Sequence, residues 1–312
     1  MNYRNYADMS ALIRRQAYLM PRDVDLIVGV PRSGIIPASM IATIRGLPLT
    51  DLDSFISGDV YKSGIKFTDH GERRFSKALI VDDSIATGAE NRRVRFRLQD
   101  IHHVHQHVEC LYAAIYALPG SENLVDLWFE QVPGPRLFEW NMLTTSLLQH
   151  ACVDIDGVLC RDPTEEENDD GERYIEFLLG AEPLFKPKKK IGWLVTSRLE
   201  KYRTQTETWL RGHGVEYDEL RMLDLPDKET RQRLNAHSIF KSSVYSRTDS
   251  ALFIESSVRQ AKEIAKQSGK PVVCTEDCQL YMPGEMDKYV AKIRRAPHTV
   301  SSRIKQAIGI FG

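Results

Sequence analysis

The sequence predicts an α/β fold with two domains, each built on a parallel β-sheet. Short runs such as residues 25–30 and 78–81 are almost entirely apolar, as strands buried on both faces of a parallel sheet are. Each run leads through a short loop into a helix-like segment, and alternating strands and helices are typical of α/β proteins. The same order recurs from residue 151, and 312 residues suffice for two domains of ordinary size.

The elements of the first half follow from this pattern. Residues 1–24 are expected to form a helix with a polar lead. A second helix should span Ile35–Arg45 and end at Gly46, because glycine readily adopts the left-handed conformation that closes a helix. Strands are predicted at 25–30, 47–56, 78–81, 108–117 and 124–132, and a further helix at 90–98. Pro133-Gly134-Pro135 breaks the pattern and marks the start of the interdomain segment.

The stretch from Lys77 to Glu90 carries the strongest functional signal. Its apolar run ends in two adjacent carboxylates, Asp82 and Asp83, which a short loop follows. Small and hydroxyl residues make up that loop: Ser84, Ala86, Thr87, Gly88 and Ala89. Backbone N–H groups of such a loop and of the next helix can bind an anion, while carboxylates accept hydrogen bonds from sugar hydroxyls. The layout fits a sugar with a 5-phosphate and a free 2,3-diol; the alternative is a buried strand ending in a solvated acidic turn.

These residues closely resemble the phosphoribosyl-pyrophosphate (PRPP) motif of type I phosphoribosyltransferases. The resemblance implies that Asp82 and Asp83 hold the ribose hydroxyls and that the loop from Ser84 to Ala89 holds the 5-phosphate. In that family the loop after the first core strand binds the pyrophosphate. Arg32, Ser33 and Gly34 occupy this place, although the tetrapeptide Pro31–Gly34 alone would indicate a plain turn.

Residues 57–76 read as a long loop with few apolar residues and several cations. A loop of this length inside a compact domain is usually functional or disordered. Type I enzymes close a mobile loop over PRPP, so the resemblance implies that Lys62 and Lys66 stabilise the leaving pyrophosphate. An ordinary solvated hairpin is the alternative.

A second acidic motif opens the other half of the chain. An apolar strand leads into Asp154, Asp156 and Gly157, and carboxylates two residues apart on an extended segment point the same way. They can share one cation, or divide the work of nucleophile and proton donor. A coincidental strand and turn is the alternative.

The segment matches the first motif of haloacid-dehalogenase-like (HAD) phosphatases. The match implies that Asp154 attacks phosphorus and that Asp156 serves as general acid and then general base. It also implies Mg²⁺ as cofactor, bound by Asp154 and by the carbonyl of Asp156.

Further segments follow in the order of the HAD motifs. Thr196 ends the strand 191–197 and resembles the second motif, which binds the phosphoryl group. Lys241 fits the third, with Lys228 as the competing choice. The strand 251–257 departs from the family, because Glu255-Ser256 stands where two acids or Gly-Asp are usual. Glu255 is expected to be the remaining metal ligand, and the missing carboxylate puts the phosphatase activity in doubt.

Only about 30 residues separate the first two of these motifs, so a large cap domain does not fit between them. The acidic residues 165–170 read as a solvated loop. The two resemblances imply Rossmann-like domains at residues 1–145 and 146–312, of the type I phosphoribosyltransferase fold and a HAD-like fold with a minimal cap.

The bulk composition bounds the setting in which such a protein works. With a net charge of −1 there is no basic bias, so we expect no nucleic-acid partner. The N-terminus lacks the apolar core of a signal peptide, and no run of about 20 apolar residues occurs that could span a membrane. Five cysteines at irregular spacing favour a reducing, cytoplasmic location.

The sequence therefore predicts a two-headed enzyme. One domain would transfer phosphoribosyl from PRPP to a nitrogenous base, and the other would hydrolyse a phosphomonoester, such as the nucleotide formed by the first. We consider a homodimer as the assembly. The alternative is a PRPP-sensing regulator whose phosphatase domain is degraded and whose basic tail, residues 286–312, binds a partner.

Overall fold

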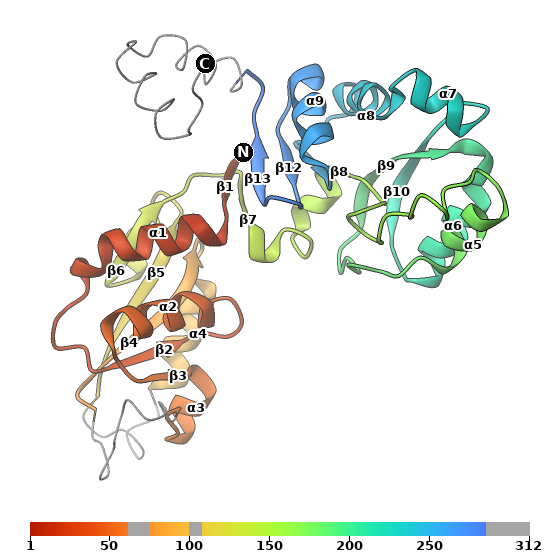
Figure 1. The fold of residues 1–312 in the computed structure, drawn as a ribbon. Coiled ribbons are helices and arrows are strands. Elements are labelled where there is room, and N and C mark those ends of the chain that lie inside the picture. Colours follow the sequence, from red (N-terminus) through yellow and green to blue (C-terminus); the bar gives the residue numbers. More distant parts are fainter. Residues whose placement is uncertain (62–74, 100–107, 285–312) are drawn as a thin grey trace, which may run out of the picture. The chain divides into compact units, whose positions relative to one another are not determined.

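The computed structural model describes residues 1–61, 75–99 and 108–284 and divides the chain into two compact units, Met1–Trp140 and Asn141–Gly312 (Figure 1). The division lies five residues before the boundary at 145 that the sequence suggested, a difference of the size expected for an interdomain segment. Lys62, Lys66 and the tail 286–312 lie outside the described residues.

The first unit is built on a parallel five-stranded sheet of order β3-β2-β4-β5-β6. Its strands are β2 (Leu26–Gly29), β3 (Leu49–Asp51), β4 (Lys77–Ile85), β5 (Glu109–Ala117) and β6 (Leu127–Gln131). A separate parallel pair joins β1 (Asn2–Arg4) to β7 (Arg136–Phe138), so the segment after the Pro133–Pro135 break still belongs to this unit. The α/β class with parallel sheets is confirmed.

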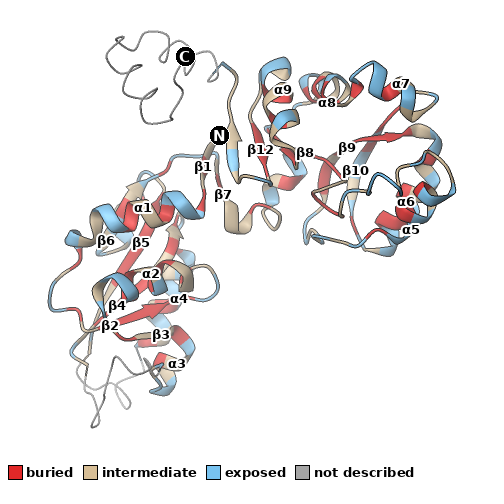
Figure 2. Cartoon of the chain, in the orientation of Figure 1, coloured by how far each residue is buried: buried red, intermediate tan, exposed pale blue. Residues whose placement is uncertain are grey.

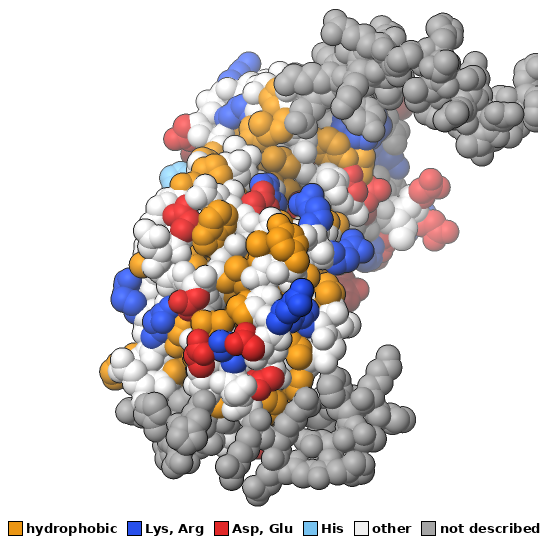
Figure 3. Space-filling model, turned by 90° about the vertical axis from the view of Figure 1, so that its left-hand side faces the viewer, with side chains coloured by type: hydrophobic (Ala, Val, Ile, Leu, Met, Phe, Trp, Pro, Cys, Tyr) orange, Lys and Arg blue, Asp and Glu red, His pale blue; other side chains and the backbone are white. Residues whose placement is uncertain are grey.

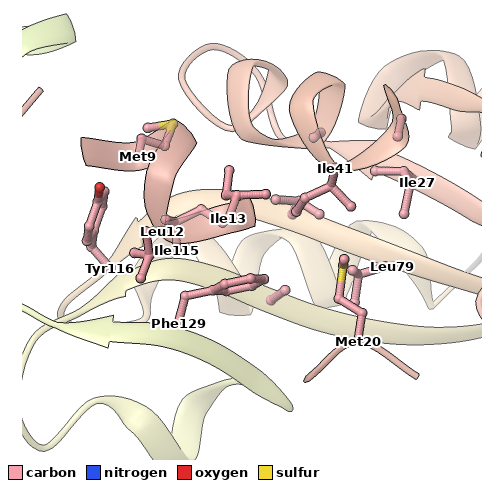
Figure 4. Packing of buried hydrophobic residues seen from close by; sticks show 14 of the residues in the cluster. Met9, Leu12, Ile13, Met20, Ile27, Ile41, Leu79, Ile115, Tyr116 and Phe129 are labelled. Carbon is pink, nitrogen blue, oxygen red and sulfur yellow. The ribbon is translucent and has the colours of Figure 1, made fainter. Parts of the chain in front are cut away.

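Helices cover both faces of this sheet. They are α1 (Tyr6–Gln16), α2 (Ile35–Arg45), α3 (Leu52–Ser57) and α4 (Ala89–Leu98), with 3₁₀ turns at Ala17–Leu19, Glu122–Leu124 and Glu139–Asn141. The core on one face packs Leu12 and Ile13 of α1 and Ile41 of α2 against Ile27 and Leu79 of the sheet (Figure 4). The opposite face packs against α3 and α4. Successive strand residues alternate between the two cores, so both faces of the strands are buried.

Two local differences from the predicted elements have clear causes. The prediction of one strand over 47–56 is wrong, because the strand ends at Asp51 and α3 begins at Leu52. The Asp51 carboxylate accepts hydrogen bonds from the N–H groups of Asp53 and Ser54, which makes it an N-cap. By contrast β4 runs beyond the apolar residues 78–81 and ends only at Ile85, so both acids of the central motif belong to the strand.

The second unit has a six-stranded sheet of order β10-β9-β8-β11-β12-β13, parallel except for the last strand. Its strands are β8 (Ala151–Val153), β9 (Ile191–Leu199), β10 (Tyr217–Leu223), β11 (Leu252–Glu255), β12 (Val272–Cys274) and β13 (Gln279–Tyr281). The helices are α5 (Glu172–Gly180), α6 (Arg203–Gly212), α7 (Lys228–Arg233), α8 (Ala236–Arg247) and α9 (Val258–Ser268), with 3₁₀ turns at Ser146–His150 and Glu200–Tyr202. In both units the strands are mostly buried and the helices expose their outer faces (Figure 2).

The acidic segment 165–170 is tied to its surroundings at three of its residues. Glu167 pairs with Arg161, and Asp169 accepts hydrogen bonds from N–H groups at the start of α5. Asp170 bonds to Lys201 and to the hydroxyl of Tyr202. The segment is a loop of turns and bends, as predicted, and Glu165, Glu166 and Asp169 are exposed; the contacts above fix how three of its carboxylates lie.

The surface carries both signs of charge, as the net charge of −1 requires. On the face drawn in Figure 3, acidic and basic side chains are interspersed with apolar ones. Within the described ranges, no helix is both long and apolar enough to cross a membrane. Cys110, Cys152, Cys160 and Cys274 form no disulfide within the described residues.

Candidate functional site

The first candidate site lies where β2 and β4 end. Asp83 is 6% exposed and both of its carboxylate oxygens accept hydrogen bonds from side chains. Ser33 Oγ donates to Oδ1 at 2.7 Å, and Trp140 Nε1 donates to Oδ2 at 2.7 Å. Neutral donors on both oxygens stabilise the charged form of a carboxylate and fix its orientation. Ser33 therefore joins the acidic pair, as the parallel order of β2 and β4 requires.

Asp82 has a different environment. Its Oδ1 accepts a hydrogen bond from the N–H of Asp83 at 2.8 Å. Burial and the neighbouring charge of Asp83 raise the pKa of Asp82 to about 8. Two adjacent acids in a sheltered site resist ionising together. A proton or a cationic ligand would therefore stabilise the pair near neutral pH.

Gly34 allows the turn after β2 to lie directly against the end of β4. A Cβ atom at this position would stand 2.6 Å from the carbonyl oxygens of both Val30 and Val81. Backbone atoms on both sides leave no room for a side chain, so glycine is required there. Arg32, in the same turn, is exposed, and no hydrogen bond of its side chain was found within the described residues.

The small-residue loop lines a pocket of about 210 Å³. Asp82 and the loop residues that were predicted to bind the phosphate all contribute to its wall: Ser84, Ala86, Thr87, Gly88 and Ala89. Gly88 precedes α4 with a φ of 69°, a conformation that suits glycine. The geometry thus places the start of α4 at the pocket, where its free N–H groups can bind an anion.

Two residues of this site escaped the sequence reasoning. Trp140 holds Asp83 and stacks on Phe138, with ring centroids 4.9 Å apart. Arg136 lines the pocket, and its Nη1 is buried without a hydrogen-bond partner in the described structure. Both follow the Pro133–Pro135 break, which the sequence reasoning took for the start of a linker. The parallel pairing of β7 with β1 is what returns this segment to the sheet.

The second candidate site surrounds Lys241, which lies on α8 and is 2% exposed. Its Nζ donates to Asp154 Oδ2 at 2.5 Å, to Glu255 Oε2 at 2.8 Å and to Gln260 Oε1 at 3.1 Å. Burial alone would lower the pKa of Lys241, but the two carboxylates outweigh it and raise the pKa. Lys241 therefore carries a positive charge that two acids share. The competing residue, Lys228, donates to the backbone carbonyl of Asn168.

Asp156 is held by a buried arginine. Arg198 Nη2 donates to Asp156 Oδ1 at 2.6 Å, and its Nε lies 3.1 Å from Oδ2. The same guanidinium donates to Cys160 Sγ at 3.2 Å. Arg198 stands two residues after Thr196, so continuing the strand beyond residue 197 would have indicated it.

The two hydroxyls at the end of β9 are not equivalent. Thr196 is fully buried, and its Oγ1 accepts a hydrogen bond from the N–H of Arg198 at 3.2 Å. Ser197 is 7% exposed, and its hydroxyl has no partner in the described structure. The free hydroxyl is thus that of Ser197, whereas the prediction named Thr196 as the phosphoryl-binding residue.

The groups predicted to bind magnesium, namely Asp154, the carbonyl of Asp156 and Glu255, are engaged by other groups of the protein. Glu255 is fully buried; Lys241 occupies its Oε2, and its Oε1 accepts the N–H groups of Ser256 and Ser257. In the part of the chain that the structure describes, no cluster of three or more His, Cys, Asp or Glu side chains is arranged to hold a metal ion. The carbonyl of Asp156 accepts a hydrogen bond from Ser256 Oγ at 3.2 Å. These groups as arranged do not fit the ion, and its binding stays a prediction.

Comparisons with known proteins match the N-terminal part of the chain. The chain is 31% identical over 143 residues to a xanthine-guanine phosphoribosyltransferase from Chromohalobacter salexigens, covering 44% of this chain and 79% of that protein. A protein of the same description from Nitratidesulfovibrio vulgaris is 29% identical over 119 residues, which is 37% of this chain and 68% of its own length. The structure of a purine phosphoribosyltransferase from Pyrococcus horikoshii aligns with a TM-score of 0.33 and 22% identity, over 45% of this chain and 92% of that one. No family model matches the sequence.

Proposed function

Because this chain belongs, through its N-terminal part, to the phosphoribosyltransferase family, we propose that it transfers the phosphoribosyl group of PRPP to a purine-like base. The observation that carries the proposal is the single pocket lined by Asp82 and residues 84–89. Asp83, the next residue after Asp82, is held by Ser33 and Trp140. The names of the relatives supply the purine class. In the reaction the bond from ribose C1 to pyrophosphate breaks, and a bond from C1 to a base nitrogen forms.

Asp82, the loop beside it and the neighbouring Asp83 each have a separate task in this proposal. The Asp83 carboxylate accepts a hydrogen bond from a ribose hydroxyl and needs no rearrangement, because Ser33 and Trp140 already hold it. Asp82 accepts from the other hydroxyl. The N–H groups at the start of α4 bind the 5-phosphate. Such fixed dipoles and charges are the main source of catalysis when a ribosyl cation develops.

Magnesium enters this site as part of the substrate. Mg²⁺ in phosphate-transfer sites is held mainly by substrate phosphates together with one or two carboxylates. Asp82 and Asp83 are the carboxylates that would hold it, and the charge that two adjacent acids concentrate there suits a divalent cation. The ion shields the negative charge of the diphosphate.

The decisive measurement is pyrophosphate release from PRPP with a panel of purine and pyrimidine bases. We expect turnover with a purine and a loss of about 100-fold or more in Asp83→Asn, since a positioned charge is removed. Asp23→Asn is the matched control, because Asp23 precedes β2 at the other end of the strands and pairs with Lys77. Tight PRPP binding without turnover on any base would instead establish the PRPP-sensing regulator.

For the second unit we propose a phosphomonoester hydrolase of the HAD type. The contact between Asp154 and Lys241 supports it, since a cation beside a buried carboxylate favours the charged form that a nucleophile needs. Asp154 would attack phosphorus and form an aspartyl phosphate while the alcohol leaves. Asp156, oriented by Arg198, would give that alcohol its proton and later take one from water.

The two activities are proposed to act in sequence, the second removing the 5-phosphate from the product of the first. When the natural chain is incubated with PRPP and the accepted base, the product should be a nucleoside. The Asp154→Asn variant should stop at the nucleotide. Nucleotide accumulation in both proteins would reject the coupling. Persistent hydrolysis in the Asn variant would show that Asp154 is not the nucleophile.

A further inference from the structure

One buried cation of the second unit lacks a counter-ion. Arg231 lies on α7 and is 6% exposed. Its Nη1 donates to the backbone carbonyl of Ser197 at 2.9 Å, and its Nε has no hydrogen-bond partner among the residues that the structure describes. Across the described residues it forms no ion pair with a carboxylate. An unpaired buried charge is costly, so its position calls for a ligand.

The other buried cations nearby are already neutralised. Lys241 contacts the carboxylates of Asp154 and Glu255, and Arg198 contacts that of Asp156. The three acids of this cluster outnumber its two cations. The cluster by itself therefore repels an anion. Arg231 is the buried cation beside it that remains available to attract one, within the part of the chain that the structure describes.

A second unpartnered group lies beside Arg231. The hydroxyl of Ser197 is buried without a hydrogen-bond partner in the described structure. Side chains alternate along β9, so Ser197 points to the same face as Val195, which packs with Tyr245 of α8. Lys241 reaches Asp154 from that same helix. The free hydroxyl, the free guanidinium and the Lys241 cluster therefore share one side of the sheet.

The positive charges of Arg231 and Lys241 affect the pKa of a neighbouring histidine. His237 lies one helical turn before Lys241 on α8. Burial lowers the pKa of His237 to about 4, and the charges of Arg231 and Lys241 contribute while Asp156 opposes. His237 is thus neutral near pH 7. The buried Tyr174 also lies near Arg231, and its hydroxyl oxygen accepts a hydrogen bond from that guanidinium.

We propose that Arg231 and Ser197 form an anion-binding site that takes a phosphate group of the substrate, beside Asp154 and Lys241. A guanidinium with an open Nε and a free hydroxyl is a donor set that suits phosphate oxygens. This inference rests on the hydrolase activity proposed above for the same unit, and it names a binding residue outside the four HAD motifs. The phosphate can be the group that is hydrolysed or a second one on the same molecule.

The test measures binding of inorganic phosphate by titration calorimetry, without turnover. We expect Arg231→Gln to weaken binding about tenfold or more, since charge-assisted hydrogen bonds are lost. Arg231→Lys should recover part of the affinity because it keeps the charge. Arg233→Gln is the matched control; Arg233 is exposed on the same helix and should leave binding unchanged. Substrates with one and with two phosphates then identify which phosphate Arg231 binds. If Arg231→Gln loses affinity for both substrates, the bound phosphate is the one that is hydrolysed. If it loses affinity for the bisphosphate alone, the bound phosphate is the second one.

A structural role for Arg231 predicts a different result. Phosphate should raise the melting temperature of the natural chain but not that of Arg231→Gln, because a ligand stabilises only a protein that binds it. Unchanged phosphate affinity in a folded Arg231→Gln would overturn the site even if hydrolysis through Asp154 is established. Arg231-dependent phosphate binding without hydrolysis of any ester would instead refute the activity and leave the site standing.

Discussion

Replacing Lys241 with methionine should destabilise the second unit by about 3–5 kcal/mol, the usual cost of removing one partner from a buried ion pair. The Lys241 ammonium lies 2.5 Å from Asp154 and 2.8 Å from Glu255, and all three side chains are at most 6% exposed. Methionine preserves most of the apolar stem, so little packing is lost. The loss of stability therefore comes mainly from two buried carboxylates that no longer have a cation beside them.

The stability of the Lys241→Met variant should also depend on pH in a definite direction. Burial and the nearby acids raise the pKa of Asp154, and Lys241 opposes that rise. Without Lys241 the folded state should bind a proton at Asp154 still more readily than the unfolded state does. The free energy of unfolding of the variant should then increase as the pH falls from about 7 to 5, more steeply than in the natural chain.

Urea unfolding followed by tryptophan fluorescence measures both effects, because Trp193 and Trp209 lie in the second unit. Lys228→Met is the control, since Lys228 contacts a backbone carbonyl and should cost about 1 kcal/mol or less. Adding Glu255→Gln to Lys241→Met should recover a large part of the loss. Equal stabilities of the two lysine variants would refute the buried ion cluster.

Three other predictions concern the first unit. Asp82→Asn should flatten the pH dependence of stability between about pH 4 and 8, because a raised pKa makes the folded state lose stability as the pH rises through that window; unfolding at several pH values checks this. Gly34→Ala should lower the free energy of unfolding by about 2 kcal/mol or more, since its Cβ would meet backbone on two sides. Gly46 has open space around it and a φ of 62°, so Gly46→Ala should lower it by about 1 kcal/mol. Urea unfolding measures both. Trp140→Phe keeps the aromatic stack and loses the bond to Asp83, so calorimetry should find PRPP binding weakened about 10-fold.

The sequence predicted those parts of the fold that rest on local patterns. Apolar runs located β2 and the start of β4, and Gly46 located the end of α2. The switch at Asp51 was missed because the hydrogen bonds that make it a helix cap are visible only in space. A capping residue and a strand residue can have the same sequence context.

The candidate sites divide along the same line. The acids were found because each pair follows an apolar strand within a few residues. The side chains that orient them were found less often, because the chain folds back to bring them there. Trp140 is 57 residues from Asp83, and Arg198 is 42 residues from Asp156. Sequence spacing carries no signal for contacts at such separations unless an alignment supplies one.

The difference matters for what each acid can do. A carboxylate with fixed donors on its oxygens, such as Asp83 or Asp156, is oriented by them. For Asp154, by contrast, burial raises the pKa while Lys241 opposes that rise. A motif therefore names the acid but not its chemical state. For Glu255, which Lys241 and two backbone N–H groups enclose, the structure favours a partner of the cation over a metal ligand. If the second unit hydrolyses phosphate esters, the charge that its substrate brings must be met by Arg231 or by an ion recruited with the substrate, and the phosphate affinities of the two arginine variants decide between them.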